Sequence, residues 1–366
     1  MRLQRGKSLE FLKSVNWPIS IAIFLQLSVG ILIISSSSVN LGFQQGVVAI
    51  FGFIIYLLIS QLDYRTLINL IKPSYFLIIL LLILVFFLGV ETRGSIRWIP
   101  LGIINIQPSE FAKPMIILFL AHFWSNRVVT WKNIFKNLLW VLPILGLVFK
   151  QPDLGTTLTI GIIWIGTLIG VGLNFRKLLT LLLILVLAIP LGLNSLEDYQ
   201  KQRISSFLSP EQDPLGQGYN IIQSTIAVGS GQLLGKGFGQ GTQSRLQFLP
   251  EFRTDFIFAS LAEELGFLGS GVIVLIYLFI ISYCLRVASK SVDFFGFLIC
   301  IGTAIMLLFQ TAVNIGMNVG LVPITGVTLP LISYGGSSLI STLMSLGLVA
   351  SVASIRRPVD IQTVGV

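Results

Sequence analysis

The chain has 366 residues, of which 54% are apolar and only 11% are charged. A water-soluble surface needs about twice that share of charged residues, so the composition excludes a soluble globular domain. The net charge of +9 does not indicate nucleic-acid binding, because the Lys and Arg residues are scattered in twos and threes between long apolar runs.

Apolar segments of membrane-spanning length follow one another along the chain. A helix of about 20 apolar residues crosses the hydrocarbon core of a bilayer. We therefore predict an all-α polytopic membrane protein, a single membrane domain over residues 1–366 with about ten transmembrane helices. The predicted spans are 17–36, 44–62, 74–90, 108–124, 135–150, 155–173, 177–194, 256–285, 293–318 and 332–355. Spans 108–124 and 135–150 are the weakest, because Lys113 and Lys150 lie in or beside them, and a buried or re-entrant helix is the alternative for either.

The distribution of charge predicts the orientation, because basic residues in short loops stay on the cytoplasmic side. With the N-terminus inside, 15 of the 24 Lys and Arg residues fall in inner segments, and most acids fall outside. We expect both termini in the cytoplasm and a retained first span, since no A-x-A cleavage site follows it. Cys284 and Cys300 fall within predicted spans, which argues against a disulfide framework or a zinc site. For His122, a packing or interfacial role is favoured over catalysis.

One long polar segment, residues 195–254, interrupts the apolar pattern between the seventh and eighth spans, and the orientation places it outside. Function is expected there, because long loops commonly carry binding and catalytic residues. Its glycines do not match G-x-G-x-x-G, because Gln240 stands where the third glycine would be when counted from Gly235. A glycine-rich turn packed on the membrane surface is favoured over direct phosphate contact.

Polar residues at the edges of the spans need an explanation, since a charge at the centre of an inserted helix costs about 2.5–3.5 kcal/mol. Glu110 and Lys113, three apart, share one helical face. The groups that stand out are Arg93, Arg97 and Trp98; residues 107–113, with Gln107, Ser109, Glu110 and Lys113; residues 150–156, with Lys150 and Asp153; residues 249–256, with Thr254 and Asp255, followed by Glu263 and Glu264; and residues 323–326 with 329–338, which include Tyr334, Ser337 and Ser338.

These groups, in this order, resemble the SEDS family of cell-wall polymerases, whose best-known members are RodA and the division protein FtsW. The resemblance runs from about residue 15 to residue 356, and residues 241–244 resemble the elongation branch, RodA, more than the division branch. Arg253 departs from the family pattern, which usually has histidine there. The motifs that carry the resemblance are R-W-I-P-L-G at 97, Q-P-S-E-F-A-K at 107, Q-P-D-L-G-T-T at 151, T-D-F-I-F-A at 254, E-E-L-G-F-L-G at 263 and P-L-I-S-Y-G-G-S-S at 330.

The resemblance implies a glycosyltransferase that polymerises lipid II into glycan strands at the outer face of the bacterial cytoplasmic membrane. Inversion at the donor sugar needs a base for the acceptor hydroxyl and cations for the leaving undecaprenyl diphosphate. Asp255 is the candidate base, and Lys113 is the candidate cation. Glu110 either orients Lys113 or holds a divalent cation, Mg or Mn; no organic cofactor is expected. The predicted substrate-binding residues are Arg93, Arg97, Trp98, Gln107, Ser109, Lys150, Asp153, Thr254, Glu263, Glu264, Tyr334, Ser337 and Ser338.

Each of these residues also has a structural interpretation. Asp255 could serve only as a helix N-terminal acid, Glu110 and Lys113 as a simple ion pair, and Asp153 as a cap. The implied partners are lipid II, a class B penicillin-binding protein that supplies the transpeptidase, and other membrane proteins of the elongation complex; no nucleic acid is expected. Two further functions stay open: a flippase for lipid II, which the outer concentration of acids disfavours, and a non-catalytic scaffold.

Overall fold

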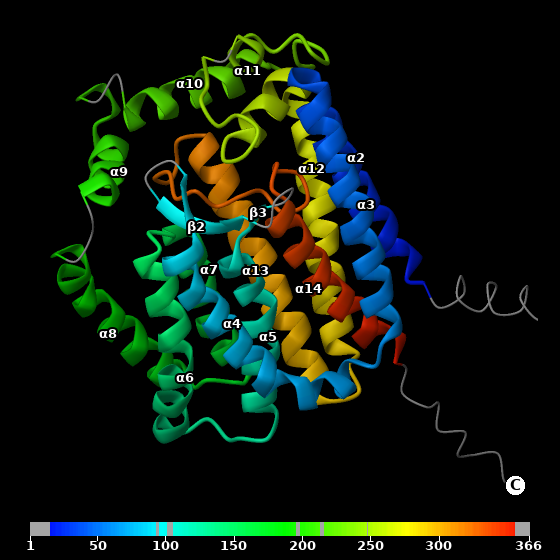
Figure 1. Ribbon diagram of the computed structural model, residues 1–366, viewed down its shortest axis with the longest axis vertical. Helices are drawn as coiled ribbons and strands as arrows, with labels where there is room; N and C mark the ends of the chain where they lie inside the picture. The colour runs from blue at the N-terminus through cyan, green and yellow to red at the C-terminus, as the bar shows by residue number, and fades with distance from the viewer. Residues whose placement is uncertain are drawn as a thin grey trace, which may run out of the picture.

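The computed structural model describes residues 15–92, 95–100, 105–194, 198–212, 216–246 and 248–355. Within this part of the chain, ten helices of 17 residues or more form one bundle (Figure 1). A helix therefore lies over each of the ten predicted spans. The ten helices are α2 (Trp17–Ser37), α3 (Val39–Gln61), α4 (Ile68–Leu88), α5 (Pro108–Ser125), α6 (Trp131–Lys150), α7 (Leu154–Gly170), α8 (Phe175–Asn194), α12 (Ile257–Ser289), α13 (Phe294–Asn318) and α14 (Gly336–Ser354).

Seven of these helices, namely α2, α3, the α4 segment, α6, α12, α13 and α14, are long and apolar enough to cross a membrane by length and composition. The protein is thus a polytopic α-helical membrane protein, and the count of ten spans stays a prediction. Fourteen of the 18 residues of α5 are buried. This helix therefore lies inside the bundle, which explains how it can carry Glu110 and Lys113.

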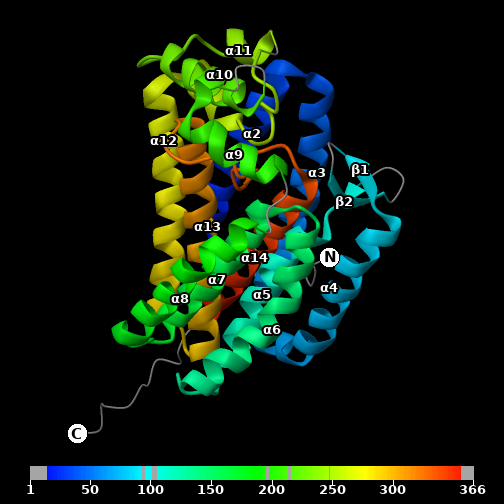
Figure 2. The same ribbon diagram turned by 90° about the vertical axis from the view of Figure 1, so that its left-hand side faces the viewer.

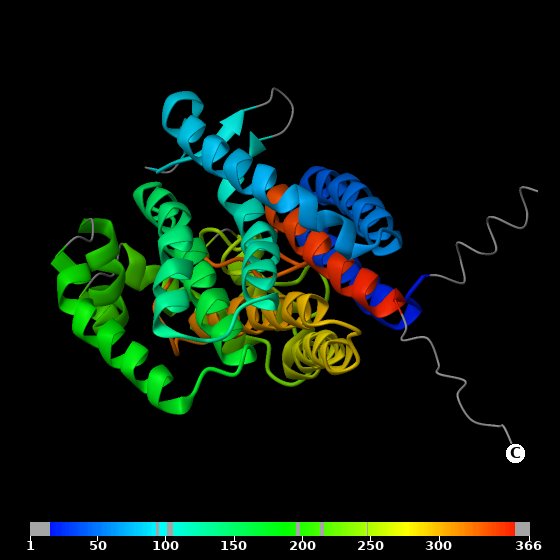
Figure 3. The same ribbon diagram turned by 90° about the horizontal axis from the view of Figure 1, so that it is seen from below.

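The helices pack closely where small residues meet. Helix α14 lies along α3, and α13 contacts α12, α7 and α5. At Gly52 of α3, an added Cβ would lie 2.6 Å from the Leu343 side chain of α14, so a larger residue there would require this leucine to move. Helix α8 lies at the periphery (Figures 1 and 3).

The strands between α4 and α5 and the long loop between α8 and α12 lie toward one end of the bundle. We call it the loop end, and it faces the top of Figures 1 and 2. Strands β1 (Val90–Thr92), β2 (Ser95–Pro100) and β3 (Asn105–Ile106) form a small antiparallel sheet between α4 and α5. The predicted loop 195–254 contains α9 (Asp198–Leu208), η2 (Pro210–Gln212), α10 (Gln217–Ser230) and α11 (Thr242–Arg245). Residues 319–335 join α13 to α14 without regular structure, so α14 begins four residues later than predicted.

At the opposite end, one carboxylate joins two parts of the bundle. Asp293 caps α13 by accepting from Gly296 N, at 2.7 Å. Its other oxygen accepts from the Tyr64 hydroxyl, at 2.7 Å, and from Arg65 Nε, at 2.8 Å, both in η1 (Tyr64–Leu67) before α4. Partial burial acts to raise the pKa of Asp293, but these three hydrogen bonds and the Arg65 charge outweigh it and lower the pKa.

The contact between α2 and the irregular segment before α14 yields a prediction. An alanine Cβ at Gly30 would lie 2.8 Å from Ile332 O and 2.9 Å from Ile332 Cα, whereas one at Gly46 of α3 would meet nothing within 4 Å. We expect Gly30→Ala to lower the free energy of unfolding by about 1–3 kcal/mol through overpacking. Gly46→Ala should raise it by up to about 1 kcal/mol through helix propensity. Thermal unfolding in detergent measures both, and equal effects would contradict the packing described.

Candidate functional site

Asp153 joins the start of α7 to the start of α5. Its Oδ1 accepts from Thr156 N, at 3.1 Å, and thereby caps α7. Its Oδ2 accepts from Gln107 Nε2, at 3.0 Å, and from Ser109 Oγ, at 2.9 Å. The side chain is 4% exposed. Of the two roles predicted for Asp153, the geometry supports the cap. The same carboxylate also links α7 to α5.

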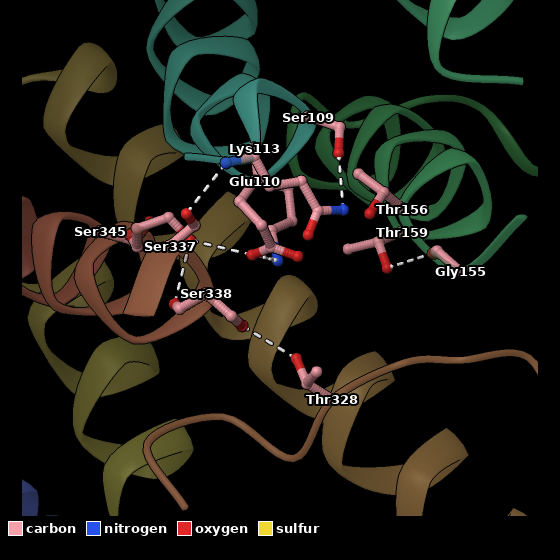
Figure 4. Close-up of polar contacts among 12 residues, drawn as sticks. Ser109, Glu110, Lys113, Gly155, Thr156, Thr159, Thr328, Ser337, Ser338 and Ser345 are labelled. Carbon is pink, nitrogen blue, oxygen red and sulfur yellow. Dashed lines mark hydrogen bonds and ion pairs between the residues drawn. The ribbon is translucent and has the colours of Figure 1, made fainter. Parts of the chain in front are cut away.

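The start of α14 joins the same network. Ser337 Oγ accepts from Gln107 N, at 3.0 Å. Ser338 Oγ shares a hydrogen bond with Thr328 Oγ1, at 2.8 Å, so α14 is also tied to the irregular segment 319–335. Figure 4 shows Ser109 of α5, Thr156 of α7 and Ser337 of α14 in the same region, with Ser338 bonded to Thr328. Three sequence blocks separated by up to 230 residues thus meet at the loop end.

Glu110 and Lys113 form a buried ion pair within the first two turns of α5. Lys113 Nζ lies 2.6 Å from Glu110 Oε2, and the two side chains are 1% and 8% exposed. Ser341 Oγ of α14 donates to the same oxygen, at 3.2 Å, and to Ser338 O, at 3.1 Å. Removing either partner would leave an isolated charge away from water, which is strongly destabilising. The pair predicted from the three-residue spacing is present, and it faces the interior of the bundle.

The contacts of Glu110 bear on its predicted role of orienting Lys113, and the predicted divalent cation stays a prediction. Among the described residues, no three His, Cys, Asp or Glu side chains gather closely enough to hold a metal ion. Glu110 Oε2 is already shared by Lys113 and Ser341. Of the two roles predicted for Glu110, orienting Lys113 is therefore the one that its contacts support.

Strand β2 is fixed to the turn before α7. Arg97 Nε donates to Gln151 O, at 3.0 Å, and its Nη2 donates to Pro152 O. The guanidinium therefore lies beside the residue that precedes Asp153 along the chain. Trp98 is partly buried, and Lys150 is exposed at the end of α6. Arg93 lies outside the described residues.

Asp255 lies in the turn before α12 and is partly buried. Its backbone carbonyl accepts from Asn314 Nδ2, at 2.9 Å, and from Asn318 Nδ2, at 3.1 Å, both on α13. The two preceding carbonyls are held as well, because Thr254 O accepts from Ser333 Oγ, at 2.7 Å, and Arg253 O accepts from Tyr334 N, at 2.8 Å. Three consecutive backbone carbonyls are thus held by two segments, α13 and the segment before α14, which fixes the backbone that carries Asp255.

Gly326 lies close to both Asp255 and Arg203, and the sequence motifs did not predict Arg203 as a site residue. Asp255 Oδ2 and Arg203 Nη1 of α9 each lie 3.7 Å from the position that a Cβ on Gly326 would take. The φ of Gly326 is +74°, a conformation that favours glycine. On the other side, a Cβ on Gly155 would lie 3.0 Å from Thr325 O. The segment around Gly326 therefore lies between the Asp255–Arg203 pair and the start of α7. Nothing in the sequence around Arg203 distinguishes it from other basic residues of the long loop.

Glu263 and Glu264, which were predicted to bind substrate, hold the glycine-rich segment. Glu263 is fully buried, and its Oε1 accepts from Lys236 Nζ and Thr242 N, both at 2.8 Å. Glu264 is 3% exposed; its Oε2 accepts from Gly239 N, at 3.1 Å, and its Oε1 from a serine of α2. Carboxylate oxygens of both residues accept hydrogen bonds from the glycine-rich segment and the start of α11. These contacts give the two glutamates an anchoring role.

Two other predicted residues, Tyr334 and Thr254, make hydrogen bonds within the protein. The Tyr334 hydroxyl donates to Gln44 Oε1 of α3, at 2.9 Å. Thr254 Oγ1 donates to Glu251 Oε2, at 3.0 Å. Glu251 has a φ of +54° and Leu331 one of +68°. Such backbone strain in non-glycine residues costs about 1–3 kcal/mol each and is concentrated at functional sites.

The Asp153 junction generates a prediction. Asp153→Ala would leave three donors without their acceptor, and we expect the free energy of unfolding to fall by about 2–4 kcal/mol. Asp153→Asn keeps a carbonyl oxygen for Thr156 N and should lose about half as much. The control is Asp63→Ala, which removes an exposed cap at the opposite end, and thermal unfolding in detergent measures all three. A loss for Asp153→Ala no larger than for the control would rule out the proposed link.

Known proteins match the chain over the region that contains these sequence motifs. The family model FTSW_RODA_SPOVE, described as cell cycle protein, matches residues 14–357. The chain is 39% identical over 348 residues to the peptidoglycan glycosyltransferase MrdB of Escherichia coli (strain K12), covering 93% of this chain and 94% of MrdB. It is 40% identical to the stage V sporulation protein E of Bacillus subtilis (strain 168), covering 84% and 85%.

Solved structures match over a similar length. A chain from a peptidoglycan synthase complex, in a structure that concerns coordination of polymerization and crosslinking, has a TM-score of 0.81 at 34% identity and covers 92% of this chain and 97% of its own length. The rod shape determining protein RodA of Thermus thermophilus has a TM-score of 0.71 at 30% identity, covering 94% and 98%. The resemblance in the sequence motifs is confirmed: this chain belongs to the FtsW, RodA and SpoVE family of cell cycle proteins.

Proposed function

We propose that this protein is a peptidoglycan glycosyltransferase that polymerises lipid II into β-1,4-linked glycan strands during cell elongation. The observation that carries the proposal is the fixed Asp255 carboxylate, which shares the space over Gly326 with the Arg203 guanidinium. A base and a cation that both lie close to Gly326 suit a reaction in which a hydroxyl loses a proton while a diphosphate leaves. Relatives named as peptidoglycan glycosyltransferases match nearly the whole chain and support the same activity.

In the proposed reaction, the carboxylate of Asp255 takes the proton of the acceptor sugar hydroxyl. The oxygen attacks the anomeric carbon of the donor, and the bond from this carbon to the diphosphate oxygen breaks. Undecaprenyl diphosphate leaves with the electron pair, and the α-linked donor becomes a β-1,4 bond through inversion. Three backbone contacts hold the turn that carries Asp255, which limits the reorganisation needed to reach the transition state.

The leaving diphosphate needs positive charge close to Asp255. Arg203 supplies it in this proposal, because its guanidinium can bind phosphate oxygens through two parallel N–H groups. Arg97 lies beside Gln151 and Pro152, across the segment that contains Gly326. Lys113 stays a predicted contributor; it is linked to that segment through Glu110, Ser341 and the Ser338–Thr328 hydrogen bond. The divalent cation predicted from the sequence stays a prediction.

The proposed orientation places the loop end outside the cytoplasm and both termini inside, as the distribution of basic residues predicts. We also propose that the protein works with a class B penicillin-binding protein that cross-links the glycan. The similar chain in a synthase complex that joins polymerization and crosslinking supports this partner.

Polymerisation of labelled lipid II by the purified protein with its penicillin-binding partner tests the function. Asp255→Asn keeps the size of the side chain and removes the base, so we expect the rate to fall at least about 100-fold. The matched control is Asp63→Asn at the opposite end, which should stay within about twofold of wild type.

Each outcome separates the candidate functions. Equal polymerisation by wild type and Asp255→Asn would remove Asp255 as the base. No polymer from a folded wild-type complex that binds its partner would favour the flippase or scaffold functions, which transport of labelled lipid II across vesicle membranes then distinguishes.

A further inference from the structure

The glycine-rich segment at the loop end exposes large apolar side chains. Leu233 is 65% exposed, Leu234 is 79% exposed and Phe238 is 54% exposed. They lie within seven consecutive residues between α10 and α11. A patch of this kind on a surface that faces water is unfavourable, and such patches mark contact with another protein or with a membrane.

The backbone of the segment pairs with α12 on both sides of a sharp kink. Gly266, with φ of +69° and ψ of −169°, interrupts the helix. Beyond it, Phe267 N donates to Gln232 O, at 2.8 Å, and Leu268 N donates to Leu233 O, at 3.1 Å. Before it, Glu263 O and Glu264 O accept from the backbone of the segment, at 2.9 and 3.1 Å. A Cβ on Gly235 would collide with Glu264 O, so glycine is required for this close contact.

These backbone hydrogen bonds place the segment beside Phe267 and Leu268 of α12. Phe267 is 70% exposed and Leu268 is 56% exposed, and both belong to a helix long and apolar enough to cross a membrane. Because Leu233 is bonded directly to Leu268, the apolar side chains of the segment lie at the same level as these two. Figures 1 and 2 show the start of α12 and the segment between α10 and α11 together at the loop end.

The amino group of the one lysine in the segment bonds back to the protein. Lys236 Nζ donates to Glu263 Oε1 and to Thr242 Oγ1, both at 2.8 Å, and its side chain is 29% exposed. Gly239 N donates to Glu264 Oε2. The lysine side chain is thus less exposed than Leu233 and Leu234, whereas in a loop that faces water the lysine is commonly the more exposed. Backbone bonds to α12 also satisfy N–H and C=O groups that hydrocarbon would leave without partners.

We propose that residues 232–238 form a membrane anchor, in which Leu233, Leu234 and Phe238 insert into the leaflet at the loop end, at the boundary between headgroups and acyl chains. Lipid is the occupant that the structure favours, because the exposed side chains continue the membrane-facing surface of α12. The anchor holds the kink of α12, and with it the turn that carries Asp255, at a fixed depth relative to the lipid. The anchor does not depend on the proposed enzymatic activity.

Depth measurement in lipid nanodiscs tests the anchor directly. Leu234→Cys, carrying a spin label, is compared with Phe267→Cys as the lipid-facing reference and with Glu211→Cys, an exposed residue of η2, as the water-facing reference. The two native cysteines are fully buried and should remain largely unlabelled. We expect the label at position 234 to match the one at 267, with high accessibility to oxygen and at least about fivefold lower accessibility to a water-soluble nickel complex than at 211.

The contrary result is equally clear. If the label at 234 is as accessible to the nickel complex as the label at 211, the segment lies in water and the anchor is wrong. If it becomes shielded only when the penicillin-binding partner is added, the patch is a protein interface and the anchor is also wrong. Leu233→Cys repeats the measurement should Leu234→Cys fail to fold. Neither result bears on polymerisation, so failure of the anchor and failure of the proposed function are distinguishable.

Discussion

A polar or charged side chain inside a helix bundle surrounded by hydrocarbon must find its partner within the protein, because no water is available to replace it. This constraint organises the loop end. Asp153 is satisfied only where α5 and α7 begin side by side, and Glu110 only where Lys113 and α14 reach it. The positions of three helix starts are therefore coupled through buried oxygens, and these starts in turn hold the segment that contains Gly326.

The same constraint explains how a loop residue can be positioned for chemistry. The turn before α12 carries Asp255, and its carbonyls receive hydrogen bonds from α13 and from the segment before α14. The asparagines of α13 are themselves buried, so their amides have fixed partners. Catalytic side chains on loops need support of this kind, because a displacement of about 1 Å can cost a factor of 100 in rate.

Hydropathy predicted the helices well, since the apolar composition of each span is a property of the local sequence. It missed the start of α4, which runs through Pro73. It also placed the start of α14 four residues too early, at Ile332, although Tyr334 N bonds to Arg253 O in the turn before α12. The long loop 195–254 was predicted as a polar interruption, yet it contains α9, α10 and α11, whose packing depends on partners remote in sequence.

The candidate site was predictable where polar motifs interrupt apolar runs, as at Asp153, Glu110 and Asp255. Motifs could not separate residues that face a substrate from residues that anchor a loop, so the contacts of Glu263 and Glu264 with the glycine-rich segment were not predicted. Arg203 was missed for a related reason, because its importance arises only from the close approach of α9 to Gly326.

The most direct test of the central claim separates binding from chemistry by measuring the affinity of fluorescent lipid II for variants of the two residues over Gly326. The account predicts that Asp255→Asn binds lipid II with a Kd close to wild type, whereas Arg203→Gln, which loses the charge for the diphosphate, binds about tenfold more weakly. If Asp255→Asn abolishes binding while Arg203→Gln binds and polymerises like wild type, the division of roles between base and cation is contradicted.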